Sequence, residues 1–205
     1  MSSYIESLKH LLAAKDHRVA LIDHFAYLAD TPGTEALLED LFQQAQKVLI
    51  DRCEEWQIST LVIQFENGRE LIAQEGLIID SLCGESWPGS YKTVAKKHSD
   101  LTFQSGEGME LSMGYGNTFQ GEYLNDPDRD MDESPLKSWL PLVGEKNDIL
   151  SPAMTATHWW LYHPTEKNSR DEPAIYSFSH SDGLKPLEDF NVGALFLRYA
   201  LDILL

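Results

Sequence analysis

The chain has 205 residues, of which 42% are hydrophobic and 24% charged, a composition that suits a globular protein with a substantial core. Against 33 Asp and Glu there are 16 Lys and Arg, which gives a net charge of −17. Nucleic-acid binding depends on Lys and Arg that displace counterions from phosphates, so this balance argues against direct contact with nucleic acid. Two explanations of the acidity stay open: solubility, and steering toward a basic protein partner.

The sequence carries no sign of export or of membrane insertion. Leu11–Ala14 is too short for the apolar region of a signal peptide, and the stretch before it is charged. The most apolar stretch, residues 192–205, is interrupted by charged residues and is too short to span a bilayer. Cys53 and Cys83 have no CxxC spacing, so we expect two free thiols, with a disulfide between them left open. We therefore expect a cytoplasmic protein.

Helical periodicity dominates the first 57 residues. Apolar residues at helical spacing predict helices over about residues 5–12 and 16–26, the second with Asp16 as its N-cap. A longer helix is predicted from about Thr34 to Leu49. We interpret residues 1–57 as a helical extension packed on a main domain of residues 58–205.

The main domain is predicted to be rich in short strands. Thr60–Phe65 is β-rich, Asn67-Gly68 is a turn dipeptide, and Glu70–Ala73 is expected to return as the hairpin partner. The other predicted elements are a helix over residues 90–98, strands at Met109–Met113, Trp139–Val143, His158–Tyr162 and Ala174–Phe178, and a helix from Asp189 to Leu205. Helices at both ends with strands between them predict an α+β fold with a mostly antiparallel sheet flanked by helices.

No motif for catalysis or for a cofactor passes its chemical test. The segment from Gly84 to Lys92 resembles a phosphate-binding loop, but Lys92 comes two residues too late and Pro88 removes an N–H donor. In the segment Gly114–Phe119, Phe119 stands where a dinucleotide fingerprint needs glycine. The histidines form no HExxH or zinc spacing, and no GxSxG is present. We therefore expect no catalytic site, no cofactor and no metal.

An acidic segment is the first candidate for partner binding. Its carboxylates alternate along the sequence at Asp126, Asp128, Asp130 and Asp132, followed by Glu133. An EF-hand loop that starts at Asp126 needs Gly at its sixth position and Glu at its twelfth, whereas this chain has Met131 and Lys137 there. We interpret the segment as a solvated acidic loop that presents negative charge to a partner.

A pair of adjacent tryptophans, Trp159 and Trp160, is the second candidate. Both lie in a predicted strand, where successive side chains point to opposite faces. Burial of both rings in the fold is one interpretation, because Trp is usually buried. The alternative is that one ring is exposed and anchors a protein interface, in which Trp is enriched.

The segment Trp87–His98 (WPGSYKTVAKKH) resembles the signature of the SUKH superfamily, in which Leu-Pro and two variable residues precede Tyr-Lys, an apolar pair and a basic helix end. Two later segments agree in order with that family. Trp139–Leu142 resembles its aromatic–hydrophobic–Pro–hydrophobic strand, and Ile175–Gly183 resembles its strand with an acidic turn. The resemblance covers about residues 76–205.

The chain departs from the family pattern in three places. Trp87 replaces the usual Leu, Ser99-Asp100 replaces the usual Asn-Gly, and the first 75 residues have no counterpart.

The resemblance implies a compact α+β fold and a binding role without catalysis. Bacterial members are frequently immunity proteins that neutralise a toxin, often a nuclease, and other relatives include fungal cell-wall synthesis regulators. Together with the charge of −17, this leads us to expect a protein that binds a basic toxin domain. The alternative is a cytoplasmic regulatory or scaffold protein with an endogenous partner, and an unrecognised hydrolase is favoured less.

Overall fold

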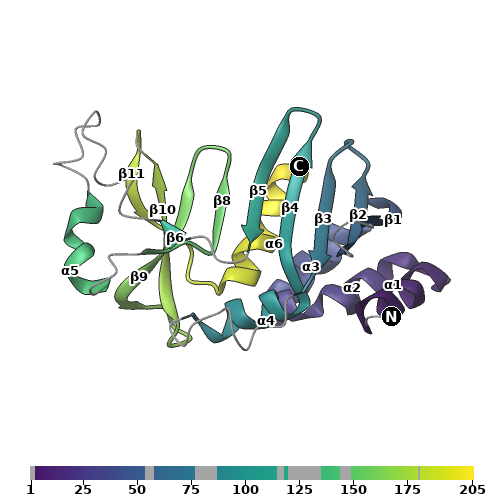
Figure 1. Cartoon of the computed structure of the whole chain (residues 1–205), viewed down its shortest axis with the longest axis horizontal. Helices are drawn as coiled ribbons and strands as arrows, with labels where there is room; N and C mark the ends of the chain where they lie inside the picture. Colours follow the sequence, from purple (N-terminus) through teal and green to yellow (C-terminus); the bar gives the residue numbers. More distant parts are fainter. Residues whose placement is uncertain are drawn as a thin grey trace.

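The computed structural model describes residues 3–53, 58–76, 87–114, 118–119, 135–143, 149–179 and 181–205. The strands of these residues form one nine-stranded sheet, in the order β1-β2-β3-β4-β5-β8-β9-β10-β11, and a two-stranded β6–β7 ribbon (Figure 1). The sheet strands are β1 (Ala45–Cys53), β2 (Ile58–Phe65), β3 (Glu70–Glu75), β4 (His98–Ser105), β5 (Gly108–Gly114), β8 (Ala153–Thr155), β9 (Trp159–Lys167), β10 (Pro173–Ser179) and β11 (Gly183–Pro186). The ribbon strands are β6 (Thr118–Phe119) and β7 (Ile149–Leu150).

Helices come before the strands of the sheet, between them and after them in the sequence. They are α1 (Ser3–Ala13), α2 (His17–Phe25), η1 (Ala26–Leu28), α3 (Pro32–Gln43), α4 (Gly89–Lys97), η5 (Pro135–Ser138), α5 (Leu140–Val143) and α6 (Val192–Leu204). All strand pairs of the sheet are antiparallel. The predicted α+β fold, with a mostly antiparallel sheet flanked by helices, is confirmed.

Local sequence signals set several of these boundaries. Asp16 caps α2, because its Oδ1 accepts hydrogen bonds from the backbone N–H groups of Arg18 (3.0 Å) and Val19 (3.3 Å). The predicted hairpin of β2 and β3 turns at Asn67-Gly68, where Gly68 has a φ of 81° that favours glycine. The strands predicted at Met109–Met113, His158–Tyr162 and Ala174–Phe178 correspond to β5, β9 and β10.

The predicted helix from Thr34 to Leu49 is wrong in its second half. α3 ends at Gln43, and β1 begins at Ala45. Val48 and Ile50 lie opposite Ile63 and Leu61 of β2, which are both fully buried. The apolar residues of this region fit the period of a strand as well as that of a helix. Pairing with β2 favours the strand.

The predicted strand at Trp139–Val143 is also wrong. The chain forms the short helix α5 there, and Leu142 is 50% exposed. Pro141 lacks the N–H that a strand inside a sheet must donate, which disfavours a ladder at this position. The segment that resembles a family strand is therefore helical in this chain.

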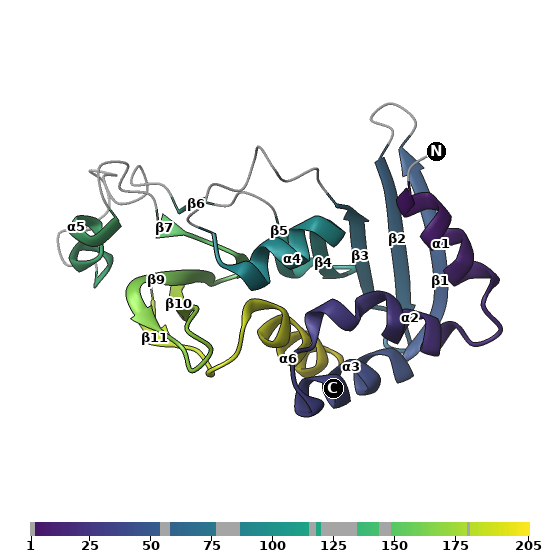
Figure 2. The same cartoon turned by 90° about the horizontal axis from the view of Figure 1, so that it is seen from below.

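Most helices pack on one face of the sheet. In the view of Figure 1, α3 and α6 lie behind β3–β5, and Figure 2 shows both on the same side of the sheet. Alternate residues of the strands point toward them, such as Leu61, Ile63 and Phe65 of β2, which are at most 2% exposed. These residues join Leu21, Phe42, Leu195 and Phe196 of the helices in one main core.

A second, smaller core lies at the β9–β11 end of the sheet. It consists of Leu136, Trp139, Ile149, Leu161 and Phe178. Leu161 belongs to this cluster, while the neighbouring Trp160 and Tyr162 belong to the main core, so the two cores lie on opposite faces of β9. Leu136, Trp139 and Ile149 thus cover the face of β9 and β10 opposite the main core.

The first 57 residues share the main core with the rest of the chain. Leu8, Leu38 and Phe42 belong to the same buried cluster as Phe103 of β4. These residues also contribute β1 to the sheet, so they are not wholly helical. The division between residues 57 and 58 falls next to residues 54–57, which lie outside the described residues, and the two-domain interpretation stays a prediction.

Candidate functional site

Of the two binding elements predicted from the sequence, the structure describes the tryptophan pair and not the acidic segment. Asp126, Asp128, Asp130, Asp132 and Glu133 lie outside the described residues. Trp160 is 1% exposed, and its ring centroid lies 4.9 Å from that of Tyr199 on α6. Trp159 is half-buried on the other face of β9, where its ring centroid lies 6.2 Å from that of Phe178. Trp160 is therefore a core residue, and Trp159 has the more accessible ring of the pair.

One face of β1–β4, which we call the open face, has none of the described helices packed on it. Figure 1 looks onto this face at β3 and β4. Its residues are Lys47, Leu49, Asp51, Thr60, Val62, Gln64, Glu70, Ile72, Gln74, Asp100, Thr102 and Gln104. Each alternates with a residue that points to the main core, and none of them is fully buried. Sequence analysis missed this face, because Val62 lies within a continuous apolar run and hides the alternation.

The open face has a row of polar side chains with fixed positions. The carboxylate of Glu70 accepts one hydrogen bond from the amide of Gln64 (2.8 Å) and another from the amide of Gln104 (3.0 Å). At the hairpin end beside it, Nε of Arg69 lies 2.9 Å from Oε2 of Glu110. The amide donors hold the Glu70 carboxylate in one orientation across three strands, so a partner would meet a preorganised negative charge.

At the opposite end of the same strands, burial raises the pKa of Asp100, and a hydrogen bond from the Thr102 hydroxyl opposes this rise. Among the residues of the open face, three are acidic and one is basic: Asp51, Glu70 and Asp100 against Lys47. The surface is therefore acidic, in keeping with the chain as a whole.

A short apolar row crosses the middle of the open face. Leu49, Val62 and Ile72 lie side by side on β1, β2 and β3, since Leu49 pairs with Val62 and Val62 pairs with Ile72. All three side chains are half-buried. Apolar residues at the centre with polar residues around them is the usual anatomy of a protein interface. Leu49, Val62 and Ile72 thus form an apolar row with polar and acidic side chains on either side of it.

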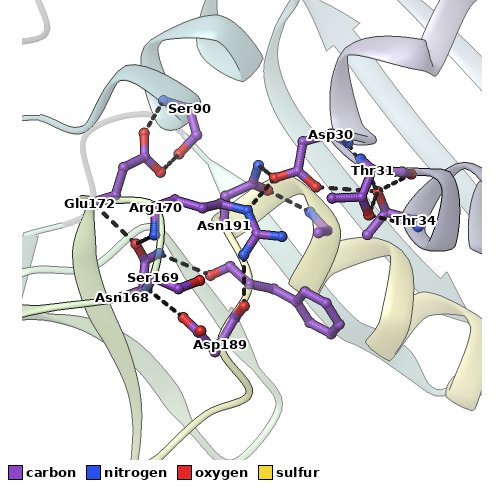
Figure 3. Close-up of polar contacts among 12 residues, drawn as sticks. Asp30, Thr31, Thr34, Ser90, Asn168, Ser169, Arg170, Glu172, Asp189 and Asn191 are labelled. Atoms are coloured by element: carbon purple, nitrogen blue, oxygen red, sulfur yellow. Dashed lines mark hydrogen bonds and ion pairs between the residues drawn. The ribbon is translucent and has the colours of Figure 1, made fainter.

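A network of polar contacts, which we call the turn junction, connects the β9–β10 turn to the N-termini of three helices (Figure 3). At α4, the carboxylate of Glu172 accepts from the backbone N–H of Ser90 (2.8 Å) and from its hydroxyl (2.6 Å). Asn168 shapes the turn itself, because its Oδ1 accepts from the N–H groups of Arg170 and Glu172 (both 3.0 Å). A carboxylate at a helix N-terminus satisfies exposed N–H groups and complements the helix dipole.

The same turn binds α3 and α6 through Arg170. Its Nε lies 2.7 Å from Oδ2 of Asp30, and its Nη1 donates to the backbone carbonyl of Asp189 (2.7 Å). Asp30 also accepts from Nδ2 of Asn191 (2.7 Å), while Oδ1 of Asn191 caps α6 by accepting from the N–H of Ala194 (2.9 Å). The polar groups of the turn junction form hydrogen bonds and an ion pair with one another, so we interpret the turn junction as structural.

The segment on which the family resemblance depends has structural contacts along its length. The ring of Trp87 stacks on Tyr91 with centroids 4.3 Å apart, and Trp87 is 7% exposed. The Tyr91 hydroxyl donates to the backbone carbonyl of Gly114 at the end of β5. Ser90 takes part in the turn junction, and His98 is buried with 1% exposure. These residues hold α4 between the sheet and the β9–β10 turn.

No group of three or more His, Cys, Asp or Glu within the described residues is arranged to hold a metal ion. None of the helices in the described part of the chain has the length and apolar character needed to cross a bilayer. Comparison of the chain with protein-family models, with curated proteins and with solved structures gives no match.

Proposed function

We propose that this protein is a cytoplasmic, non-catalytic binding protein that neutralises a basic protein, as SUKH-type immunity proteins neutralise nuclease toxins. The net charge of −17 carries the proposal. An acidic protein that blocks a basic nuclease places carboxylates where the nuclease would bind phosphates, and long-range attraction speeds the encounter.

The open face supports this proposal with a surface of suitable chemistry. Its carboxylates at Asp51, Glu70 and Asp100 surround the apolar row at Leu49, Val62 and Ile72. The apolar row would be desolvated at the centre of a complex, and the carboxylates would pair with Lys or Arg of the partner around it. The acidic segment Asp126–Glu133 and Trp159 remain proposed contacts of the same partner.

The alternative is a cytoplasmic regulatory or scaffold protein whose partner is endogenous. The same open face serves both functions, so surface chemistry does not separate them. The partner does, because a toxin kills an unprotected cell and an endogenous partner does not.

Co-expression tests the proposal directly. We expect cells that express a toxin encoded beside this gene to survive when the chain is present, and the chain to co-purify with the toxin domain. A matched variant with Ile72→Arg and Glu70→Lys on the open face should fold normally. It should protect the cells poorly, because it places cations against a basic partner. If no neighbouring gene encodes a toxin and an endogenous protein co-purifies instead, the regulatory function replaces the proposal.

A further inference from the structure

Two histidines meet inside a cluster of aromatic rings between the N-terminal helices and the sheet. His98, the first residue of β4, is 1% exposed and stacks on Phe25 with ring centroids 5.1 Å apart. Its Nε2 lies 3.2 Å from Nε2 of His24 on α2. The ring of Tyr4 on α1 packs edge-on against His98, and the hydroxyl of Tyr27 in η1 contacts Nδ1 of His98. One imidazole thus has both of its ring nitrogens bound to neighbouring side chains.

These contacts define a directed chain of hydrogen bonds. A neutral imidazole has one N–H donor and one acceptor nitrogen. If the Tyr27 hydroxyl donates to Nδ1 of His98, then Nε2–H of His98 donates to Nε2 of His24, and His24 keeps its own proton on Nδ1. The hydrogens on the Tyr27 hydroxyl and on Nε2 of His98 then both have acceptors. The opposite direction would leave the Tyr27 hydrogen with no acceptor among the described residues, so the first direction is favoured.

Adding one proton breaks this arrangement. A proton on Nε2 of His24 would face the N–H of His98 across 3.2 Å, so His98 must move its proton to Nδ1 and donate to Tyr27 instead. The Tyr27 hydrogen then loses its acceptor in a buried place. A second proton would set two N–H groups against each other. The network therefore accepts a first proton only at the cost of a buried Tyr27 hydroxyl without an acceptor, and a second proton only if His24 and His98 move apart.

The surrounding charges do not favour protonation. Lys97, the last residue of α4, acts on both imidazoles, and Glu75 of β3 acts on the Tyr4 hydroxyl. Burial is the main cause that lowers the pKa of His24 to about 4, with Lys97 second. Burial, His24 and Lys97 hold the pKa of His98 well below its ordinary value. Burial also raises the pKa values of Tyr4 and Tyr27, so both hydroxyls stay protonated.

We propose that the His24–His98 pair is an acid-sensitive latch that holds α1 and α2 on the sheet at neutral pH and releases them in mild acid. His24 lies on α2, and the Tyr4 hydroxyl on α1 donates to the backbone carbonyl of Ala73 in β3 (3.3 Å). When the two imidazoles separate, the packing of Tyr4 against His98 is lost with them. α1 and α2 then leave the sheet together, while α6 keeps its own contacts with the main core.

The sign of the effect follows from the pKa values. In an opened state the His24 imidazole reaches water and has its ordinary pKa of about 6.5. In the closed state its pKa is about 4, so the opened state binds more protons between these two values. The contribution of His24 to the stability of the closed latch is therefore complete above about pH 6.5 and is lost as the pH falls toward 4. His24 alone changes the ratio of opened to closed molecules on the order of 50-fold between pH 7 and pH 4.5.

Hydrogen exchange measured at pH 7 and pH 4.5, with intrinsic rates corrected for pH, tests the latch. We expect the amides of α1 and α2 to lose protection in acid while those of α6 keep theirs. His24→Gln supplies a neutral acceptor to His98 and should abolish most of the acid response. His10→Gln, an exposed histidine of α1, should leave it unchanged.

Two results would overturn the latch. Equal loss of protection in α6 would mean global acid unfolding, and an unchanged acid response in His24→Gln would place the titrating group elsewhere. Should His24→Gln fail to fold, the imidazole resonances of the wild-type chain decide by NMR. A His24 that titrates near pH 6.5 in the closed protein contradicts the proposal, and one that titrates near pH 4 supports it.

Discussion

Gly193 shows how a single side-chain atom limits the packing of the molecule. It lies in the first turn of α6, where a Cβ would come within 2.8 Å of the carbonyl oxygen of Leu28 and 3.1 Å of its Cα. Both are backbone atoms of η1, which cannot rotate away as a side chain can. The absence of a side chain at this position lets α6 approach the N-terminal helices closely.

We expect Gly193→Ala to destabilise the protein by about 1–2 kcal/mol. Alanine favours a helix over glycine by roughly 1 kcal/mol, but overpacking against fixed atoms costs about 1–3 kcal/mol and is expected to win. Urea denaturation followed by circular dichroism measures the difference. Gly106→Ala is the matched control, because a Cβ there meets nothing within 4 Å, and it should change stability by less than about 0.5 kcal/mol. Increased stability in Gly193→Ala would show that the backbone of η1 moves away from the new Cβ at little cost.

Individual residues were predictable from the sequence where their role is local. Asp16 as an N-cap and Gly68 in a turn depend on neighbours within three residues. The pairing of His24 with His98 joins residues 74 positions apart, and no spacing rule connects them. Glu172 at the N-terminus of α4 is likewise 82 positions from Ser90. Contacts of this kind follow from the fold and can be found only after the fold is known.

At the scale of elements, the turn junction makes one β-turn responsible for the N-termini of α3, α4 and α6. The Glu172 carboxylate supplies the α4 cap that Pro88, the residue before the helix, cannot provide from its own side chain. The Arg170–Asp30 pair is partly shielded, with side chains 27% and 24% exposed. The position of the turn and the directions of the helices therefore depend on each other.

We expect Glu172→Gln to cost about 1–2 kcal/mol of stability. Its carboxylate accepts two hydrogen bonds from Ser90, whereas glutamine has a single acceptor oxygen and no charge to complement the helix N-terminus. Thermal unfolding measures the loss, and exchange of the first amides of α4 locates it. Glu107→Gln, in the exposed β4–β5 turn, removes the same charge and should be neutral. An equal loss in both variants would assign the effect to net charge instead of the cap.

Elements were predictable where the sequence has one period and a clear stop. β2, β5, β9 and β10 alternate or are bounded by turn residues, and they were found. The region 45–49 satisfies both periods, and its state depends on the neighbouring β2, which lies later in the chain. In the region 139–143, Trp139 is buried in the second core, and an apolar run of this length looks the same in a sequence whether it is helix or strand.

For the whole molecule, the net charge of −17 has opposite effects on folding and on binding. Like charges repel within the folded protein and attract a basic partner, and salt screens both interactions over about 8 Å at roughly 0.15 M. Raising the salt from about 0.01 M to about 0.15 M should therefore increase the melting temperature by a few degrees while it slows association.

We expect the association rate of the partner to fall over the same range, with little change in dissociation, which depends on desolvated central contacts. Changing Asp128, Asp130 and Asp132 together to Asn should act in the same direction, leaving folding intact or slightly improved and slowing association. Stopped-flow kinetics with the co-purified partner measures both rates. If the association rate does not change with salt, the net charge serves solubility alone. If calcium raises the melting temperature, the acidic segment is a metal site.

The packing of α6 on α3 and η1 has a consequence for synthesis of the chain. α6 is translated after every strand of the sheet, yet its residues Leu195, Phe196 and Leu197 complete the core begun by the first helices. While α6 is still inside the ribosome, the inner faces of β2–β5 lack this cover and expose buried-type residues such as Phe103 and Leu111 to water. The strands can form hairpins one after another, because each pairs mainly with its neighbour in the sequence, but the nascent protein cannot close its core until α6 emerges. We therefore expect the nascent protein to be most prone to aggregation before α6 emerges.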